Sequence, residues 1–244
     1  MRARVYLAIV LVLAGLGACT ARNPNAPVLV YTGTGTSPND VTAILNLLAR
    51  NAIAHDTASS DELDAMDPAA LRQRRLIIVP GGNFIEMGAV LTPATTAKVR
   101  AAVHDGVHYL GICAGGFLAG RINGHPSFDL TNGVQFGFYA ASRQGIRKTV
   151  VPIVWPGHAT LEHYWEDGPQ LTGWGAPVAT YPDGTPAVVE GEVGKGWVVL
   201  AGVHPEAPED WRTGMTFRTP VSEDQAFAVT LIRAALDRTS LLPR

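Results

Sequence analysis

The chain contains little cysteine and almost no net charge. Only two of its 244 residues are cysteines, and its formal net charge is −2. The near-neutral charge argues against nucleic acid as a partner, because phosphate binding requires clustered lysine and arginine. One short basic run, LRQRR at 71–75, is typical of a solvated helix face. The 47% apolar composition allows a sizeable core, and the length suits a single α/β domain.

The first 19 residues predict a secretory signal rather than part of the fold. Two arginines precede an apolar run over 5–16, which is shorter than the roughly 20 residues needed to span a bilayer. The run ends in Leu-Gly-Ala-Cys, which resembles a bacterial lipobox with Cys19 as the lipidated residue. We therefore expect an exported lipoprotein, with residues 20–27 as a tether and with membrane contact only through the lipid. The alternative is ordinary signal cleavage followed by release.

Residues 28–244 are expected to form one domain in which strands and helices alternate. Apolar runs with many β-branched residues predict strands at 27–35, 52–58, 75–82 and 107–113. Capping residues and prolines predict helices that begin near 37, 92 and 114. This alternation predicts a mostly parallel sheet with helices on both faces.

The C-terminal half follows a different pattern of short strands separated by turns. Strands are expected at 134–138, 149–155, 177–181, 187–192 and 197–204. A glycine-containing turn at 194–196 predicts a hairpin between the last two. A final helix is expected from Ser222, with a capping box formed by Ser222 and Gln225.

The stretch HYLGICAGGFLAG at 108–120 places Cys113 among glycines at the end of an apolar run. GICAG has the spacing of a nucleophile elbow, with cysteine as the nucleophile. In such a turn the nucleophile has strained backbone angles, and side chains two residues away on either side would clash. The turn also lies at a helix N-terminus, where the helix dipole favours the thiolate. The alternative is a buried cysteine in a glycine-rich packing site.

A base for this thiolate is available in GVHPE at 202–206. His204 follows an apolar strand and should therefore emerge at the carboxyl edge of the sheet, where open α/β sheets bind ligands. Glu206 could hold the imidazole in one tautomer, which is the role of the third group in a catalytic triad. A solvated loop histidine is the alternative.

VPGGN at 79–83 ends another predicted strand and supplies backbone that can approach a ligand closely. The N–H groups of Gly82 and Ala114 are candidate oxyanion donors. Further pocket residues are expected where neighbouring strands end: Gly33, Thr34, Gly81, Asn83 and Gly115. The alternatives are a plain Pro-Gly-Gly turn and, at Gly33 and Thr34, a simple helix cap.

Two other patterns resemble cofactor or metal sites but lack the required spacing. Gly33-Thr34-Gly35 does not complete a dinucleotide fingerprint, because Pro38 stands where a third glycine is needed. The histidines and glutamate of GHATLEHYWEDG at 157–168 lack zinc-site spacing. We therefore expect no cofactor and no metal. The aromatic pair Tyr164 and Trp165 is expected in the core, or else in a pocket wall or partner surface.

The order of three motifs along the chain resembles the pattern of the class I glutamine amidotransferase-like superfamily. The motifs are a strand that ends in PGG, the G-x-C-x-G turn and an H-P-E near the C-terminus. A closer resemblance is to biotin-protein ligase N-terminal domains and related stand-alone bacterial proteins, and it extends over residues 28–236. The stretches that carry it are VYTGTGTSPNDV, VPGGN, YLGICAGGF and GKGWVVLAGVHPE. The resemblance implies a flavodoxin-like three-layer sandwich. It implies Cys113 as nucleophile, His204 as base and Glu206 as orienting acid. Gly82 and Ala114 would then form the oxyanion hole.

One departure from the superfamily pattern affects the expected activity. Glutamine amidotransferases usually carry Gln or Glu a few residues after the nucleophile, where this chain has Phe117. We therefore expect neither glutaminase activity that feeds a synthetase nor biotin ligation. Two functions stay open: a cysteine-dependent hydrolase of a small amide or ester, and a non-catalytic domain that binds a small ligand or acts as a scaffold. The sequence gives no indication of the oligomeric state.

Overall fold

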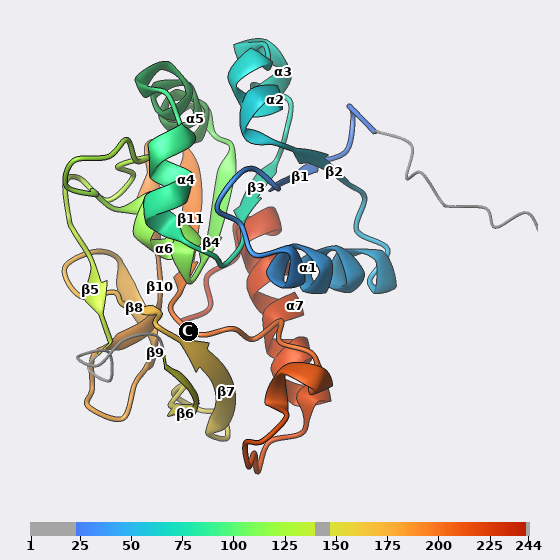
Figure 1. The fold of residues 1–244 in the computed structure, drawn as a ribbon, viewed down its shortest axis with the longest axis vertical. Helices are drawn as coiled ribbons and strands as arrows, with labels where there is room; N and C mark the ends of the chain where they lie inside the picture. The colour runs from blue at the N-terminus through green and yellow to red at the C-terminus, as the bar shows by residue number, and fades with distance from the viewer. Residues whose placement is uncertain (1–22, 140–146, 243–244) are drawn as a thin grey trace, which may run out of the picture.

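A computed structural model describes residues 23–139 and 147–242. The predicted signal segment, Cys19 and the first residues of the tether lie outside the described residues. The domain is built on a seven-stranded sheet with strand order β2-β1-β3-β4-β11-β10-β9 (Figure 1). Its strands are β1 (Val28–Tyr31), β2 (His55–Ala58), β3 (Leu76–Val79), β4 (His108–Ile112), β9 (Ala176–Thr180), β10 (Pro186–Val193) and β11 (Gly196–Ala201).

Six of these strands run in one direction, and only β10 runs in the opposite direction. β2, β1, β3, β4 and β11 run in one direction, whereas β10 pairs antiparallel with both β11 and β9. β10 and β11 are joined by the turn predicted at 194–196. The mostly parallel sheet with antiparallel strands in the C-terminal half confirms the predicted fold class.

Helices cover both faces of the sheet (Figure 1). The helices are α1 (Pro38–Arg50), α2 (Ser60–Ala65), α3 (Pro68–Arg72), α4 (Phe84–Val90), α5 (Pro93–Asp105), α6 (Ala114–Ala119) and α7 (Val221–Asp237), with a 3-10 turn, η2 (Glu209–Arg212). α1 and α7 pack on one face with one core, and the second core lies beneath α2 to α6. Two cores form because successive side chains of a strand point to opposite faces of the sheet. In β1, Val28 and Val30 pack in the first core, and Leu29 and Tyr31 pack in the second.

The helix starts follow from local capping chemistry. Ser37 accepts a hydrogen bond from the Asp40 N–H at the start of α1, and Thr92 does the same for Thr95 in α5. The capping box predicted at Ser222 is wrong. α7 begins one residue earlier, at Val221, with Pro220 as its cap. Ser222 thus lies within the first turn, where it cannot have the extended backbone that a capping side chain requires.

Two small antiparallel sheets lie apart from the main sheet. β6 (Lys148–Ile153) pairs with β7 (Leu161–Glu166), and β5 (Gly137–Phe138) pairs with β8 (Pro169–Gln170). The strand expected at 134–138 is therefore only two residues long.

The basic run at 71–75 is not simply a solvated face. Arg74 is buried, and its Nη2 lies 3.1 Å from Oδ2 of Asp56. Its guanidinium also donates a hydrogen bond to the carbonyl of Ala26, so the buried charge has partners inside the fold. Within the described part of the chain, no helix has the length and apolar character needed to cross a bilayer.

Candidate functional site

The site lies at the carboxyl ends of four adjacent parallel strands. β1 leads into α1, β3 into the Pro-Gly-Gly turn, β4 into Cys113 and β11 into the loop that carries His204. Parallel strands end at the same edge of a sheet, so these four segments meet although they are far apart in sequence. A cavity of about 1000 Å³ opens there. Its lining includes Ser37, Asp40, Gly82, Asn83, Phe84, Cys113, Ala114, Phe117, Phe138, Lys148, Tyr164, Glu166, His204 and Trp211.

Cys113 has the backbone of a strained elbow between β4 and α6. Its φ of 49° and ψ of −105° are unusual for a residue with a side chain. A Cβ at Gly111 would lie 2.5 Å from the carbonyl oxygen of Gly115, and one at Gly115 would collide with the carbonyl of Val79. The two glycines are therefore what allows β4 to turn sharply into α6 against β3, and Cys113 lines the cavity at the start of that helix.

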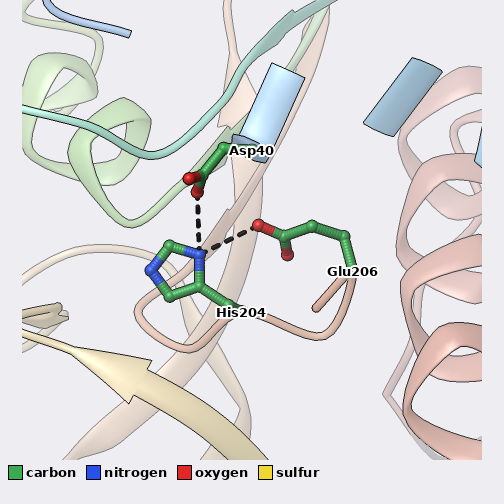
Figure 2. A group of neighbouring side chains, drawn as sticks. All are labelled: Asp40, His204 and Glu206. Carbon is green, nitrogen blue, oxygen red and sulfur yellow. Dashed lines mark hydrogen bonds and ion pairs between the residues drawn. The ribbon is translucent and has the colours of Figure 1, made fainter. Parts of the chain in front are cut away.

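His204 is held by two carboxylates at the same ring nitrogen (Figure 2). Its Nδ1 lies 2.9 Å from Oε1 of Glu206 and 3.0 Å from Oδ1 of Asp40. All three side chains are buried. Nδ1 therefore carries a proton, which forms a hydrogen bond to Glu206, while Asp40 makes an ion-pair contact with the same nitrogen. Nε2 is left as the ring nitrogen able to exchange a proton with a substrate.

The charges of this cluster shift the three pKa values in different directions. Burial lowers the pKa of His204, but the negative charges of Cys113, Glu206 and Asp40 outweigh burial and raise it well above its ordinary value. Burial raises the pKa of Glu206, and His204 offsets this only in part. Burial also acts to raise the pKa of Asp40, yet the charge of the neighbouring His204 leaves this pKa lowered. Asp40 is thus the ionised partner of the imidazolium.

Asp40 was not predicted as a site residue. In the sequence it stands out only as an acidic residue in the first turn of a helix, which the helix dipole already explains. The structure shows a second reason. A Cβ at Gly81 would lie 2.6 Å from Cε1 of His204 and would collide with the Asp40 carboxylate. The absence of a side chain at Gly81 is therefore what allows the imidazole and this carboxylate to meet.

The other predicted residues divide into two groups. Gly82, Asn83 and Ala114 line the cavity with Cys113, and Ala114 is the first residue of α6, where backbone N–H groups lack helical partners. Gly33 and Thr34 lie outside the cavity lining and pack near Ser60, whose Oγ accepts from the Thr34 N–H at 3.2 Å. The expectation that they line the pocket is wrong, because the chain turns toward α2 before it reaches the site.

Two further predicted positions have structural places beside the site. Gly115 packs against β3, and Gly81 contacts the Asp40–His204 pair rather than the open space of the cavity. Both were expected as pocket lining. Their role in the structure is to let other groups approach each other.

Two aromatic rings pack against His204. The rings of Tyr164 and Trp211 lie 5.7 and 5.9 Å from the imidazole. The backbone N–H of His204 donates a hydrogen bond to the backbone carbonyl of Tyr164 at 2.9 Å, which connects β7 to the loop after β11. β7 also contacts the nucleophile, since the Cys113 thiol lies 3.6 Å from the carbonyl oxygen of Glu166. Trp165, next in the strand, points the opposite way into the core.

Among the described residues, Asp40, His204 and Glu206 are also the one cluster with donor atoms close enough for a metal ion, all within 4.8 Å of one another. Two ligands of a tetrahedral zinc ion at about 2.0–2.2 Å would lie about 3.4 Å apart. Nδ1 is closer than that to both carboxylate oxygens, at hydrogen-bond length. The spacing fits an imidazolium shared by two carboxylates.

Comparison with known proteins gives a family match over part of the chain and a fold. Residues 26–146 match the family described as "Biotin-protein ligase, N terminal". A glutamine amidotransferase crystal structure superposes with a TM-score of 0.62 at 19% identity, covering 86% of this chain and 98% of that one. A glutamine amidotransferase from Thermotoga maritima gives 0.53 at 12% identity, covering 88% and 98%. No curated protein matches the sequence.

The same fold also occurs inside larger enzymes. A β-galactosidase from Bacillus circulans sp. alkalophilus gives a TM-score of 0.53 at 16% identity, covering 86% of this chain but only 31% of that one. At these identities the structural matches establish the fold alone. Together with the family match, they confirm the resemblance predicted from the sequence motifs.

Proposed function

We propose that this chain, which has the fold of glutamine amidotransferase structures and matches the biotin-protein ligase N-terminal family over residues 26–146, is a cysteine-dependent hydrolase of a small amide or ester. One observation carries the proposal. A cysteine on a strained elbow and a histidine held by two carboxylates line the same cavity. A structural cysteine requires neither the strain nor a histidine in the same cavity.

The groups present suffice for acyl transfer through a thioester. The Cys113 thiolate attacks the carbonyl carbon, and the negative charge on the resulting tetrahedral oxygen is stabilised by the N–H groups of Gly82 and Ala114. The intermediate collapses, the C–N or C–O bond breaks, and the leaving amine or alcohol takes the Nε2 proton of His204. Water then gives a proton to Nε2 and attacks the thioester, which releases the acid and restores the thiolate. Asp40 and Glu206 keep the ring oriented and charged during the first step.

Alkylation kinetics test the site directly. At pH 6 we expect iodoacetamide to label Cys113 about tenfold faster than a free cysteine peptide, because the imidazolium and the α6 N-terminus stabilise the thiolate. The rate is followed by mass spectrometry of the labelled peptide. Cys113→Ser is the control that identifies the label, and His204→Asn, checked for folding, should bring the rate down to that of the peptide. A wild-type rate no faster than the peptide's would exclude an activated nucleophile.

A second candidate, binding without turnover, is favoured by one observation. Phe117 lines the cavity where the superfamily usually has Gln or Glu. If the site only binds, small amides should raise the melting temperature of the wild type and of Cys113→Ser equally, and neither should release product. Product release by the wild type alone would decide for the hydrolase.

We also propose that the protein is exported and anchored through a lipid on Cys19. The support is the arginine-plus-apolar segment that ends in Leu-Gly-Ala-Cys. In a bacterial host, the full-length chain should partition into the detergent phase, whereas Cys19→Ser should not, because a lipid chain supplies the membrane affinity. Cys113→Ser is the matched control and should partition like the wild type. Equal partition of the Cys19→Ser variant and the wild type would reject lipidation.

A further inference from the structure

One wall of the cavity is built from phenylalanines. Phe84 stacks on Phe117 with ring centres 4.3 Å apart, and Phe138 lies 5.0 Å from Phe117 and 6.0 Å from Phe84. The three rings come from α4, α6 and β5, which are separate parts of the sequence. All three line the cavity, and Ile85 extends the same wall.

This wall is adjacent to the nucleophile. Phe117 lies four residues after Cys113, about one helical turn on, and its N–H donates to the Cys113 carbonyl at 3.2 Å. A substrate whose carbonyl carbon is placed on the sulfur therefore has its acyl chain within reach of the Phe117 ring. The polar end of Gln or Glu at this position would instead offer hydrogen bonds to a polar acyl chain.

The wall also keeps apolar surface in contact with water. Phe138 is 44% exposed and Ile85 is 40% exposed, so both are among the most exposed large apolar residues of the described chain. Exposed apolar groups that gather in a concave site, rather than singly on a convex surface, are typical of a ligand-binding wall.

The remaining cavity lining includes polar and charged side chains. Lys148, Tyr164 and Glu166 contribute there, with the Glu166 carboxylate accepting from the Tyr164 hydroxyl at 2.6 Å and lying 3.4 Å from the Lys148 ammonium. Asp167 and Asp210 also line the cavity. These charged groups are far less suited to binding an apolar chain than the phenylalanine wall is. The apolar end of a substrate would therefore bind at the wall and a polar end at the charged groups.

We propose that the site takes amides or esters whose acyl group ends in an aromatic ring, which packs against Phe84, Phe117 and Phe138. This inference rests on the proposed hydrolase function and specifies its substrate class. It excludes glutamine-like acyl groups, because a buried polar chain end would find no partner on this wall.

Ammonia release from primary amides is the test of turnover. We compare acetamide, glutamine, phenylacetamide and 3-phenylpropanamide at equal concentration. The better phenyl substrate should show a kcat/KM at least about tenfold above acetamide and glutamine, since even one buried methylene changes this ratio about tenfold. Binding is measured in parallel, as the rise in melting temperature that each amide gives to Cys113→Ala.

Variants locate the preference on the wall. Phe138→Ala should lower the ratio of kcat/KM for phenyl substrates to kcat/KM for acetamide several-fold. Because Phe138 is largely exposed, we expect the variant to fold like the wild type. Phe117→Leu should keep most of the preference and Phe117→Gln should lose it, which separates apolar contact from mere bulk. Val154→Ala removes an equally exposed apolar side chain outside the cavity and should leave the ratio unchanged.

The outcomes distinguish the two proposals. Turnover with equal kcat/KM for acetyl and phenyl substrates would overturn the aromatic substrate class and leave the hydrolase standing. No ammonia from any amide and no acid from the corresponding methyl esters, with phenyl amides still stabilising Cys113→Ala but not Cys113→Ala/Phe138→Ala, would overturn the hydrolase and support the aromatic wall. Neither turnover nor stabilisation would overturn both.

Discussion

Replacing His204 with alanine should lower the free energy of unfolding by about 3 kcal/mol at pH 7, and should abolish hydrolysis. The side chains of Asp40 and Glu206 are 8% and 0% exposed, and in the variant nothing positive remains between them. Removing one partner of a buried ion pair costs more than the pair contributes, because the remaining charge is left without solvation. Urea unfolding at several pH values measures the loss.

The pH dependence of this loss follows from the directions of the pKa shifts. In the wild type, the raised pKa of His204 stabilises the fold fully below the ordinary histidine value of 6.5 and loses that effect as pH rises through the folded value. The lowered pKa of Asp40 stabilises the fold above 3.8 and loses its effect only as pH falls below that. Both contributions are therefore present near pH 5.

In the His204→Ala variant the two carboxyls have raised pKa values and take up protons as pH falls from 7 to 5, which removes their buried charge. The difference in stability between wild type and variant should therefore shrink over that range. His204→Ala/Glu206→Gln should recover part of the loss at pH 7, and His104→Ala, an exposed histidine on α5, should change little. A loss independent of pH, or no recovery in the double variant, would show that the cluster acts only through packing.

Gly115→Ala should destabilise the protein by about 2–3 kcal/mol, which lowers Tm by about 5–10 °C for a chain of this size. The added Cβ would collide with the backbone carbonyl of Val79, which is fixed in the central sheet by its pairing with β4. Because the collision is with backbone, no side-chain rotation can relieve it. α6 would have to move away from β3, and Cys113 at its start would move with it.

The neighbouring glycine provides a matched control. A Cβ at Gly116 would lie 3.3 Å from Cγ of Pro169 and 3.7 Å from the carbonyl oxygen of Ala201, which small shifts accommodate. Alanine is favoured over glycine in a helix by about 1 kcal/mol, so Gly116→Ala should be close to neutral. Thermal unfolding of the two variants compares them directly. Equal destabilisation would mean that α6 is intolerant of any added carbon and that the elbow is not specially constrained.

The sequence by itself determined the order and type of the strands of the main sheet and of helices α1, α5, α6 and α7, although it predicted neither β7 nor α2 to α4. Buried strands such as Leu76–Val79 are continuous apolar runs ended by glycine or proline, and helix starts such as Ser37-Pro38 carry their own caps. The elbow at Cys113 was also predictable, because its geometry needs glycines at fixed spacing in a short stretch of chain. These features depend on residues close together in sequence.

Only the tertiary structure decided which side chains surround the nucleophile. Asp40 reaches His204 because β1 and β11 end at one edge of the sheet and because Gly81 leaves space between them. Phe84, Phe117 and Phe138 form one wall although α4, α6 and β5 each contribute a single ring. Gly33 and Thr34, which follow the same strand β1 before Asp40 is reached, lie against Ser60 instead. The strand pattern indicates where strands end, but side-chain directions beyond that edge are set by packing between segments distant in sequence, and no local pattern records them.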